Sequence, residues 1–200
     1  MKVLIISAHP KSESFIHSLR LVVTEELVHQ GHEVREHDLY EDKFNPVLTA
    51  YERQNHGAPL YPKIESYPEL IPYVEDLKWC DALVLVYPTW WSGQPAIMKG
   101  WFDRVLVNEV AWTLPADSNR IRPLLTHIKR FVVVTSHGSS KFINALEGEG
   151  GKRTAFRSVR LMMNLRTRSS WIAFYGLDNK NDRQRAAMVT KARRRIRRAL

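Results

Sequence analysis

A chain of 200 residues is long enough to bury a core on both sides of a sheet, and we expect residues 1–200 to form a single domain. The hydrophobic share of 44% is ordinary for a globular protein, and no apolar run approaches the roughly 20 residues that span a bilayer. The N-terminal residues lack the apolar stretch of a signal peptide, and the single cysteine, Cys80, excludes an internal disulfide. A cytoplasmic location is therefore expected.

The net charge of +9 is unevenly distributed along the chain. Residues 152–200 carry 15 Lys and Arg against two acidic residues, whereas residues 1–151 carry 15 against 19. A basic surface can attract nucleic acid or anionic lipid. No aromatic interleaving or nucleic-acid motif accompanies these cations, so a solvated helix face is favoured and no nucleic-acid partner is expected.

Apolar spacing predicts strands that alternate with helices. In the first part of the chain, we predict a strand at 2–7, a helix at 15–30 ended by Gly31, a strand at 32–39, and an irregular excursion at 40–67 with prolines at 46, 59 and 62. A helix at 69–79, a strand at 81–87, a helix at 95–107 and a loop at 108–123 follow. The last part is predicted to contain a strand at 130–136, helix within 142–165 interrupted at 148–151, a strand at 169–176, and a helix at 182–199 with Asp182 as its N-cap. Such alternation indicates an α/β protein with a doubly wound, five-stranded parallel sheet and helices on both faces.

The turn after the first predicted strand, residues 8–15, has the composition of an anion site. The helix start offers unpaired N–H groups and the positive end of its dipole, while Ser12 and Ser14 add hydroxyls and His9 adds a ring N–H. N-capping of the helix by Ser12 or Ser14 explains the same residues equally well. The chain lacks both G-x-G-x-x-G and G-x-x-x-x-G-K-[ST], which disfavours a tightly held NAD cofactor and an ATP substrate.

Two adjacent tryptophans, Trp90 and Trp91, follow the third predicted strand and are bracketed by Pro88 and Gly93. A single tryptophan is usually a core residue. Two adjacent tryptophans just past the end of a strand are less easily buried together in a core. Ligands of open parallel sheets bind at the carboxyl edge of the sheet, where this strand ends. This turn suits a flat ring ligand better than a phosphate.

Small polar residues follow the fourth predicted strand, at 135–140. Their backbone N–H groups could converge on an acceptor, or Ser139 or Ser140 could simply cap the next helix. Strands one, three and four are neighbours in the doubly wound order. We therefore expect a phosphate site, an aromatic platform and N–H donors to face one crevice.

Other chemistries find no support in the sequence. The eight histidines form neither H-x-x-x-H nor H-E-x-x-H, and no His/Cys cluster occurs, so no metal site is expected. No G-x-S-x-G nucleophile elbow is present. Cys80 precedes a strand, where a nucleophile would be badly placed.

Four segments together resemble the NAD(P)H quinone reductase and modulator-of-drug-activity branch of the flavodoxin-like proteins. They are His9-Pro10 with Ser14-Phe15, Asp38–Tyr40 with 44–49, Val110–Leu114, and above all Tyr87–Val105, whose residues 93–105 read as G-x-P-A-I-[LM]-K-G-W-F-[DE]-R-V. The resemblance covers about residues 2–145. It implies a flavodoxin-like fold, a bound flavin, two-electron reduction of quinones or similar flat acceptors by NADH or NADPH with ping-pong kinetics, and a homodimer.

The resemblance also implies roles for particular residues. Those expected to hold the flavin phosphate and ribityl chain are His9, Ser14, Phe15 and the backbone of Ile16. Those expected to line the isoalloxazine ring are Pro88, Thr89, Trp90 and Trp91. Those expected to approach its pyrimidine edge are Thr135, Ser136, His137 and Gly138. Trp112 is expected to cover the substrate pocket from the partner subunit, and no side chain is expected to be an obligatory acid or base.

The chain departs from this family at several positions. Ile16 stands where relatives commonly carry Asn, and His137 replaces the second glycine of the fourth-strand turn. A Tyr and a His that follow this turn in mammalian-type enzymes correspond approximately to Phe142 and Gly148, so an acid role for that pair is not expected here.

Two further hypotheses concern the cofactor and the class of protein. FMN is expected rather than FAD, because no run of residues is dedicated to an adenine. The competing functional hypothesis is a flavin-binding regulatory or ancillary protein that docks an acidic partner through its basic C-terminus.

Overall fold

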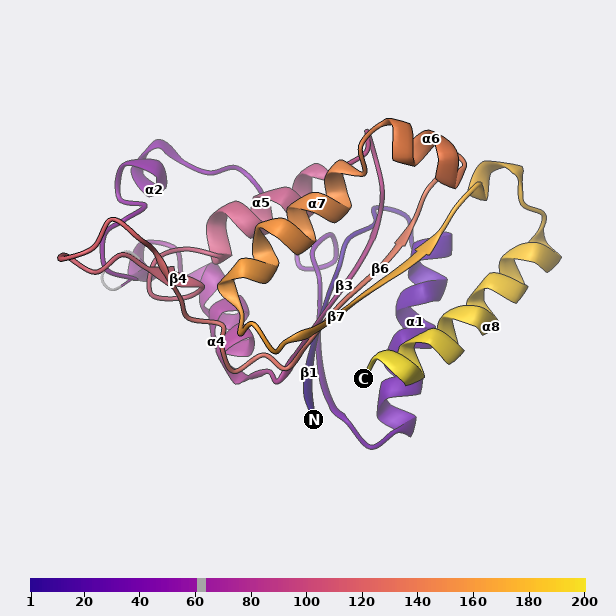
Figure 1. Cartoon of the computed structure of the whole chain (residues 1–200), viewed down its shortest axis with the longest axis horizontal. Coiled ribbons are helices and arrows are strands. Elements are labelled where there is room, and N and C mark those ends of the chain that lie inside the picture. Colours follow the sequence, from indigo (N-terminus) through magenta and orange to yellow (C-terminus); the bar gives the residue numbers. More distant parts are fainter. Residues whose placement is uncertain (61–63) are drawn as a thin grey trace.

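The computed structural model describes residues 1–60 and 64–200; Pro62, one of the prolines in the predicted excursion, lies outside them. Five parallel strands form one sheet in the order β2-β1-β3-β6-β7 (Figure 1). Their bounds are β1 Lys2–Ser7, β2 Glu33–Asp38, β3 Ala82–Pro88, β6 Arg130–Ser136 and β7 Arg168–Phe174. The predicted doubly wound sheet is confirmed, and β1, β3 and β6 are neighbours at its centre.

Helices cover both faces of the sheet (Figure 1). On one face lie α1 (Phe15–His29) and α8 (Asp182–Ala199), and on the other lie α4 (Ile71–Trp79), α5 (Ala96–Val105) and α7 (Gly150–Arg157). The short elements are helices α2 (Ala50–Gln54) and α6 (Lys141–Leu146), and 3-10 turns at Ile64–Ser66, Pro68–Leu70, Val159–Met162 and Leu177–Asn179. Helix α1 ends as predicted, with Gln30 as its C-cap and Gly31 at φ +76°.

Successive side chains of each strand point to opposite faces of the sheet, so each strand contributes to the hydrophobic cores on both faces. In β1, Val3 and Ile5 pack toward α1 and α8, while Leu4 and Ile6 pack into the opposite core. All four are wholly buried, and each contributes roughly 1.5–3 kcal/mol of hydrophobic stabilisation. Because both faces are covered, the strand reads as a continuous apolar run.

The basic C-terminal helix is attached to α1 through one buried carboxylate. Glu26 is 1% exposed and accepts from Arg197 Nε at 2.6 Å, while Arg193 lies 3.6 Å away. The bond from Arg197 lowers the pKa of Glu26 to about 2. Part of the terminal arginine run therefore has a structural role.

A second buried ion pair holds the described part of the excursion, residues 40–60 and 64–67, which contains more regular structure than predicted. Thr49 and Glu52 form a capping box at the start of α2. Arg104, 2% exposed, donates from Nε to Glu52 at 2.7 Å and from Nη1 to the Asn45 carbonyl at 2.7 Å. This arginine fastens the excursion to α5.

Three local predictions are corrected by the structure. Asn181 is the N-cap of α8 and forms a capping box with Gln184, so the prediction of Asp182 was wrong; Asp182 stands in the first turn, where its charge meets the helix dipole. The predicted glycine interruption is shorter, because α7 begins at Gly150. The loop at 108–123 contains a two-stranded antiparallel ribbon, β4 Trp112–Thr113 and β5 Arg122–Pro123.

No helix in the described part of the chain combines the length and the hydropathy needed to cross a membrane.

Candidate functional site

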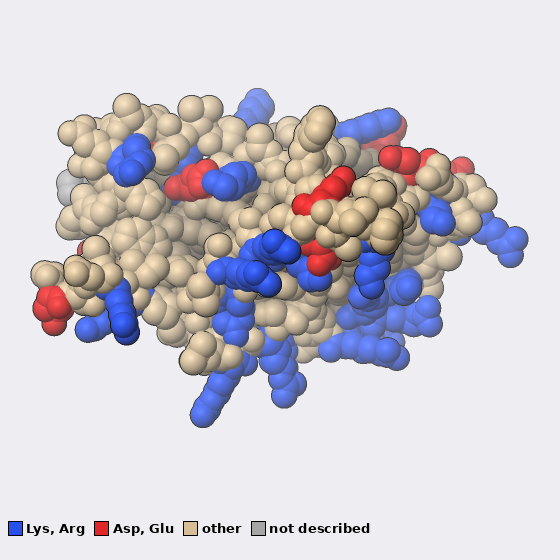
Figure 2. Space-filling model, turned by 45° about the horizontal axis from the view of Figure 1, so that its top comes forward, with Lys and Arg blue, Asp and Glu red and all other residues tan. Residues whose placement is uncertain are grey.

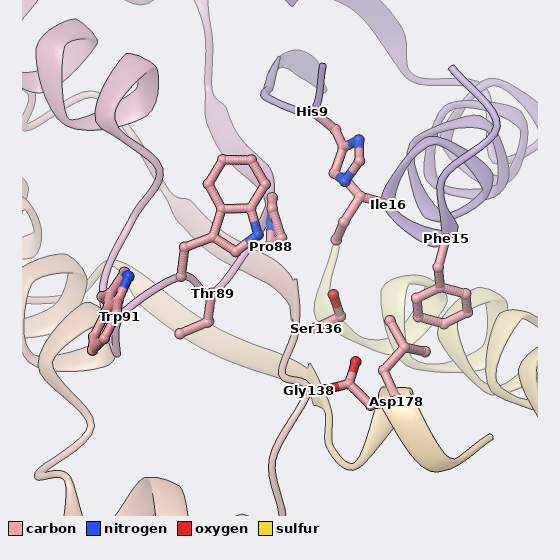
Figure 3. Close-up of a pocket in the computed structure, with 11 residues that line it drawn as sticks. His9, Phe15, Ile16, Pro88, Thr89, Trp91, Ser136, Gly138 and Asp178 are labelled. Atoms are coloured by element: carbon pink, nitrogen blue, oxygen red, sulfur yellow. The ribbon is translucent and has the colours of Figure 1, made fainter. Parts of the chain in front are cut away.

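A cavity of about 540 Å³ opens at the carboxyl edge of the sheet (Figure 3). Turns that follow β1, β3, β6 and β7 form its wall, so the three turns predicted to share a crevice do so, with a fourth beside them. The lining residues are His9, Phe15, Ile16, Pro88, Thr89, Trp90, Trp91, Ser136, Gly138, Leu177 and Asp178. In the described residues, no group of three or more His, Cys, Asp or Glu could hold a metal ion.

The β1 turn presents the start of α1 to this cavity. Ser14 is the N-cap, and its hydroxyl accepts from the His17 N–H at 3.1 Å. Ser14 does not line the cavity, whereas Phe15 and Ile16 do. As first-turn residues, these two have N–H groups without an intrahelical partner, so the helix start keeps its capacity for an anion.

His9 is the one basic side chain among the lining residues. His9 Nδ1 lies 3.0 Å from the Lys11 backbone nitrogen and 3.1 Å from the Lys11 carbonyl oxygen; when Nδ1 accepts from the Lys11 N–H, the proton of the neutral ring is on Nε2. Partial burial lowers the pKa of His9, and its ring lies edge-on to Trp90 with centroids 5.9 Å apart. With its proton on Nε2, this imidazole presents an N–H donor in the cavity wall.

The two tryptophans lie on a tight turn. Trp90 and Gly93 exchange two backbone hydrogen bonds of 3.1 and 3.0 Å, and between them Trp91 and Ser92 have φ of +47° and +58°. Positive φ at both central positions is the geometry of a two-residue hairpin turn that glycine and asparagine usually occupy. The backbone is held from outside: Ser92 donates to Glu147 at 2.7 Å, and its carbonyl accepts from the Gly151 N–H at 2.6 Å.

Neither tryptophan belongs to the core. Trp91 is fully exposed and Trp90 is 41% exposed, in contrast to the wholly buried Trp101 of α5. The core interpretation of the pair is therefore excluded. Trp90 is the better placed of the two, because it contacts His9 across the mouth of the cavity.

The β6 turn divides its residues between the cavity and the interior. Ser136 and Gly138 line the cavity, while Thr135 is wholly buried and its hydroxyl lies 3.0 Å from that of Thr89. The His137 N–H already donates to the Phe174 carbonyl at 2.8 Å. Of the predicted backbone donors, Gly138 N–H remains without an acceptor among the described residues. Ser140 caps α6, as one of the two interpretations proposed.

His137 lies behind the cavity wall, in a smaller hollow of about 250 Å³ shared with Thr89 and Gly138. Its Nδ1 lies 2.6 Å from Asn144 Oδ1, and its Nε2 lies 3.4 Å from the hydroxyl of Thr89. Its ring also stacks on Tyr175 at 4.5 Å, and burial lowers the pKa of His137. The bond to Asn144 fixes the Nδ1–H tautomer, so Nε2 is an acceptor for the Thr89 hydroxyl.

Nine of the twelve predicted cofactor-binding residues line the cavity, and Ser14, Thr135 and His137 do not. Trp112 is also outside it: its Nε1–H donates to the Leu106 carbonyl at 3.0 Å, and its ring stacks on His56. Phe142 is 70% exposed and Gly148 has φ +83°, so these two positions supply no acid.

Leu177 and Asp178 were missed by the sequence interpretation. They lie in the 3-10 turn that follows β7, the strand next to β6. The sequence did indicate that this turn would lie near the cavity, since the carboxyl end of a fifth parallel strand lies at the same edge of the sheet. A short polar turn without periodicity gave no reason to choose those two residues.

A family model described as flavodoxin-like fold matches residues 1–200. An uncharacterized NAD(P)H oxidoreductase of Haemophilus influenzae is 39% identical over 114 residues, which are 56% of this chain and 54% of that protein. NAD(P)H dehydrogenase [quinone] 1 of Rattus norvegicus is 32% identical over 124 residues, which are 56% of this chain and 45% of that protein. This chain spans about half the length of the curated relatives it matches.

A solved structure, the NAD(P)H:quinone oxidoreductase from Methanothermobacter marburgensis, is 26% identical with a TM-score of 0.80 and covers 98% of each chain. The resemblance noted from the sequence is thus confirmed. With a family match along its whole length and the expected strand order, the chain belongs to the flavodoxin-like family.

Proposed function

We propose that this protein is a flavin-dependent NAD(P)H oxidoreductase that reduces quinones or similar flat acceptors by two electrons. The observation that carries the proposal is the cavity itself, which joins an aromatic wall to the open N-terminus of α1. An aromatic wall suits a flat ring, and a helix start suits a phosphate. Relatives whose names include NAD(P)H oxidoreductase or NAD(P)H dehydrogenase [quinone] support it.

The lining residues fit a flavin mononucleotide. A volume of about 540 Å³ lies within the roughly 300–1,000 Å³ of small-molecule sites. The His9 N–H and the first-turn N–H groups of α1 would hold the phosphate, and Pro88 and Trp90 would contact the ring. We propose FMN rather than FAD, because the described lining residues provide for a ring and one phosphate and offer no second set of groups for an adenine.

A bound flavin would supply the hydride chemistry, and this chain would supply position and electrostatics. The Gly138 N–H and Ser136 hydroxyl would donate to the pyrimidine edge and stabilise negative charge there, as donors of an oxyanion hole do. Thr89 would be oriented from behind by His137, whose Nε2 accepts a hydrogen bond from the Thr89 hydroxyl. No side chain is required as an obligatory acid or base.

The electron donor, NADH or NADPH, and the acceptor would occupy the same open space over the ring in turn. Such alternation gives ping-pong kinetics. The test is steady-state turnover by FMN-loaded protein at several concentrations of each nicotinamide and of a soluble quinone. Parallel double-reciprocal lines are expected, and mass spectrometry of the released cofactor is expected to identify FMN. Turnover with intersecting lines would contradict the shared space, and protein that stays colourless with FMN and with FAD would contradict the function.

We further propose a homodimer in which Trp112 reaches the cavity of the partner subunit. Support comes from its position outside its own cavity and from the exposed apolar side chains Phe142 and Leu146 on α6. One chain has a mass of 23.3 kDa, and light scattering is expected to give twice that mass. A monomer would contradict this arrangement.

A second candidate function, an ancillary flavin protein, is favoured by one observation. Lys191, Arg194 and Arg198 of α8 have no carboxylate partner among the described residues, unlike Arg193 and Arg197. Figure 2 shows Lys and Arg side chains gathered on one part of the surface. An acidic protein partner would suit such a surface. Tight flavin binding without turnover of NADH or NADPH would favour this candidate over the enzyme.

A further inference from the structure

Asp178 is the one acidic side chain in the wall of the cavity. It enters from the 3-10 turn Leu177–Asn179, opposite the aromatic turn that follows β3. No hydrogen bond or ion pair engages its carboxylate within residues 1–60 and 64–200. A charged acceptor that lines a cavity without a partner of its own is available to a ligand.

This carboxylate lies against the β6 turn. It lies over Gly138 so closely that a Cβ at that residue would collide with Oδ2 (Figure 3). Glycine at position 138 therefore leaves room for Asp178 itself. The two residues bring an acceptor and the unpaired Gly138 N–H to the same part of the wall.

This part of the wall consequently presents two donors, the Gly138 N–H and the Ser136 hydroxyl, and one acceptor, the Asp178 carboxylate. The pyrimidine edge of an isoalloxazine ring presents the complementary series, a carbonyl, the N3–H and a second carbonyl. A buried or half-buried donor left without an acceptor costs free energy, so the middle position of this series needs one. Resting on the proposed function, we propose that Asp178 accepts a hydrogen bond from N3–H and so selects a flavin ring with that edge inward.

A role in holding the phosphate is excluded by charge, because a carboxylate repels a phosphate. The ribityl hydroxyl groups are the other donors of a flavin, and they make the competing assignment. The two assignments differ in one respect: methylation of N3 removes the ring donor and leaves every hydroxyl in place.

The experiment measures the affinities of riboflavin and 3-methylriboflavin by fluorescence quenching, for the wild-type protein, Asp178→Ala and Asp182→Ala. Neither probe carries a phosphate, so the lost charge cannot mask the effect. Asp182 is the matched control, an acidic residue four positions later that does not line the cavity. Asp178→Ala is expected to weaken riboflavin about 10- to 100-fold, as for a hydrogen bond to a charged group, and 3-methylriboflavin less than about twofold. Asp182→Ala is expected to leave both affinities unchanged.

Equal losses for both flavins in Asp178→Ala would overturn the inference and assign Asp178 to the ribityl chain. Unchanged affinities for both would overturn it by removing Asp178 from the site. Either result leaves the proposed function standing, whereas a wild-type protein that binds neither riboflavin nor FMN contradicts the function and the inference together.

Discussion

At the scale of single residues, exposure separates tryptophans of the site from a tryptophan of the core. Replacing Trp90 by Ala is expected to lower FMN affinity about 10- to 100-fold, because it removes a ring from the cavity wall, and to leave thermal stability nearly unchanged. Replacing the buried Trp101 is expected to cost about 3–5 kcal/mol in the free energy of unfolding. Fluorescence titration and urea unfolding of both variants make the comparison.

If the two substitutions destabilised the protein equally and Trp90→Ala left FMN affinity unchanged, Trp90 would be a structural residue. The proposal that an aromatic wall binds the flavin ring would then be contradicted.

His137 provides a residue-scale prediction about pH. Burial lowers its pKa in the folded protein, so the unfolded chain binds the proton more readily. Its contribution to stability is therefore fully present above its unfolded pKa of about 6.5 and is lost as the pH falls below that value. His137→Gln is expected to lose less stability than the wild type between pH 7.5 and pH 5 in urea unfolding. If the wild type and the variant lost the same free energy of unfolding over this pH range, that result would contradict a lowered pKa of His137 in the folded protein.

At the scale of elements, Arg104 is the connection between α5 and the excursion that carries α2. Arg104→Ala leaves the carboxylate of Glu52, 6% exposed, buried without its cation. Removing one partner of a buried pair costs about 3–5 kcal/mol. Limited proteolysis is expected to cut the variant first between residues 43 and 60. The exposed pair Lys99–Asp103 on the same helix is the control, and Lys99→Ala is expected to change the free energy of unfolding by less than about 1 kcal/mol.

A proteolysis pattern in Arg104→Ala identical to that of the wild type would show that the other contacts of the excursion hold it without Arg104, among them the hydrogen bonds from Asn108 to the Gly57 and Ala58 carbonyls.

Elements with a strong period were the most predictable part of this fold. The strand β1 was predicted at its observed bounds because Val3, Leu4, Ile5 and Ile6 are apolar toward both cores. The N-cap of α8 was misplaced by one residue, since Asn181 and Asp182 are both good N-caps and only side-chain geometry distinguishes them. The start of α7 depends on Gly150 and Gly151 packing against the Ser92 carbonyl, a contact between segments far apart in the sequence.

The residues of the candidate site that could be predicted are those that directly follow a predicted strand. His9, Trp90 and Gly138 follow strands whose order could be inferred, and all three line the cavity. His137 could not be assigned in this way, because its partner Asn144 comes from helix α6 and its partner Tyr175 from the turn after β7. Asp178 was missed because the short polar turn that carries it has no periodicity from which to choose one residue.

At the scale of the whole molecule, two hydrophobic cores share one sheet. Neighbouring residues of each strand belong to opposite cores, so neither core can be lost while the other keeps its strands. We therefore predict that residues 1–200 unfold as one domain. Differential scanning calorimetry is expected to show one transition whose calorimetric and van't Hoff enthalpies agree. Two resolved transitions would contradict this prediction.

Every function proposed for this protein requires flavin binding at the carboxyl edge of the sheet. The most direct measurement is a titration of the purified, cofactor-free protein with FMN, followed by flavin fluorescence and by the visible absorbance retained after desalting. We predict saturable quenching with one FMN per chain, weakened by Trp90→Ala and unaffected by Asp182→Ala. No quenching and no retained flavin, with FMN and with FAD alike, would contradict the account.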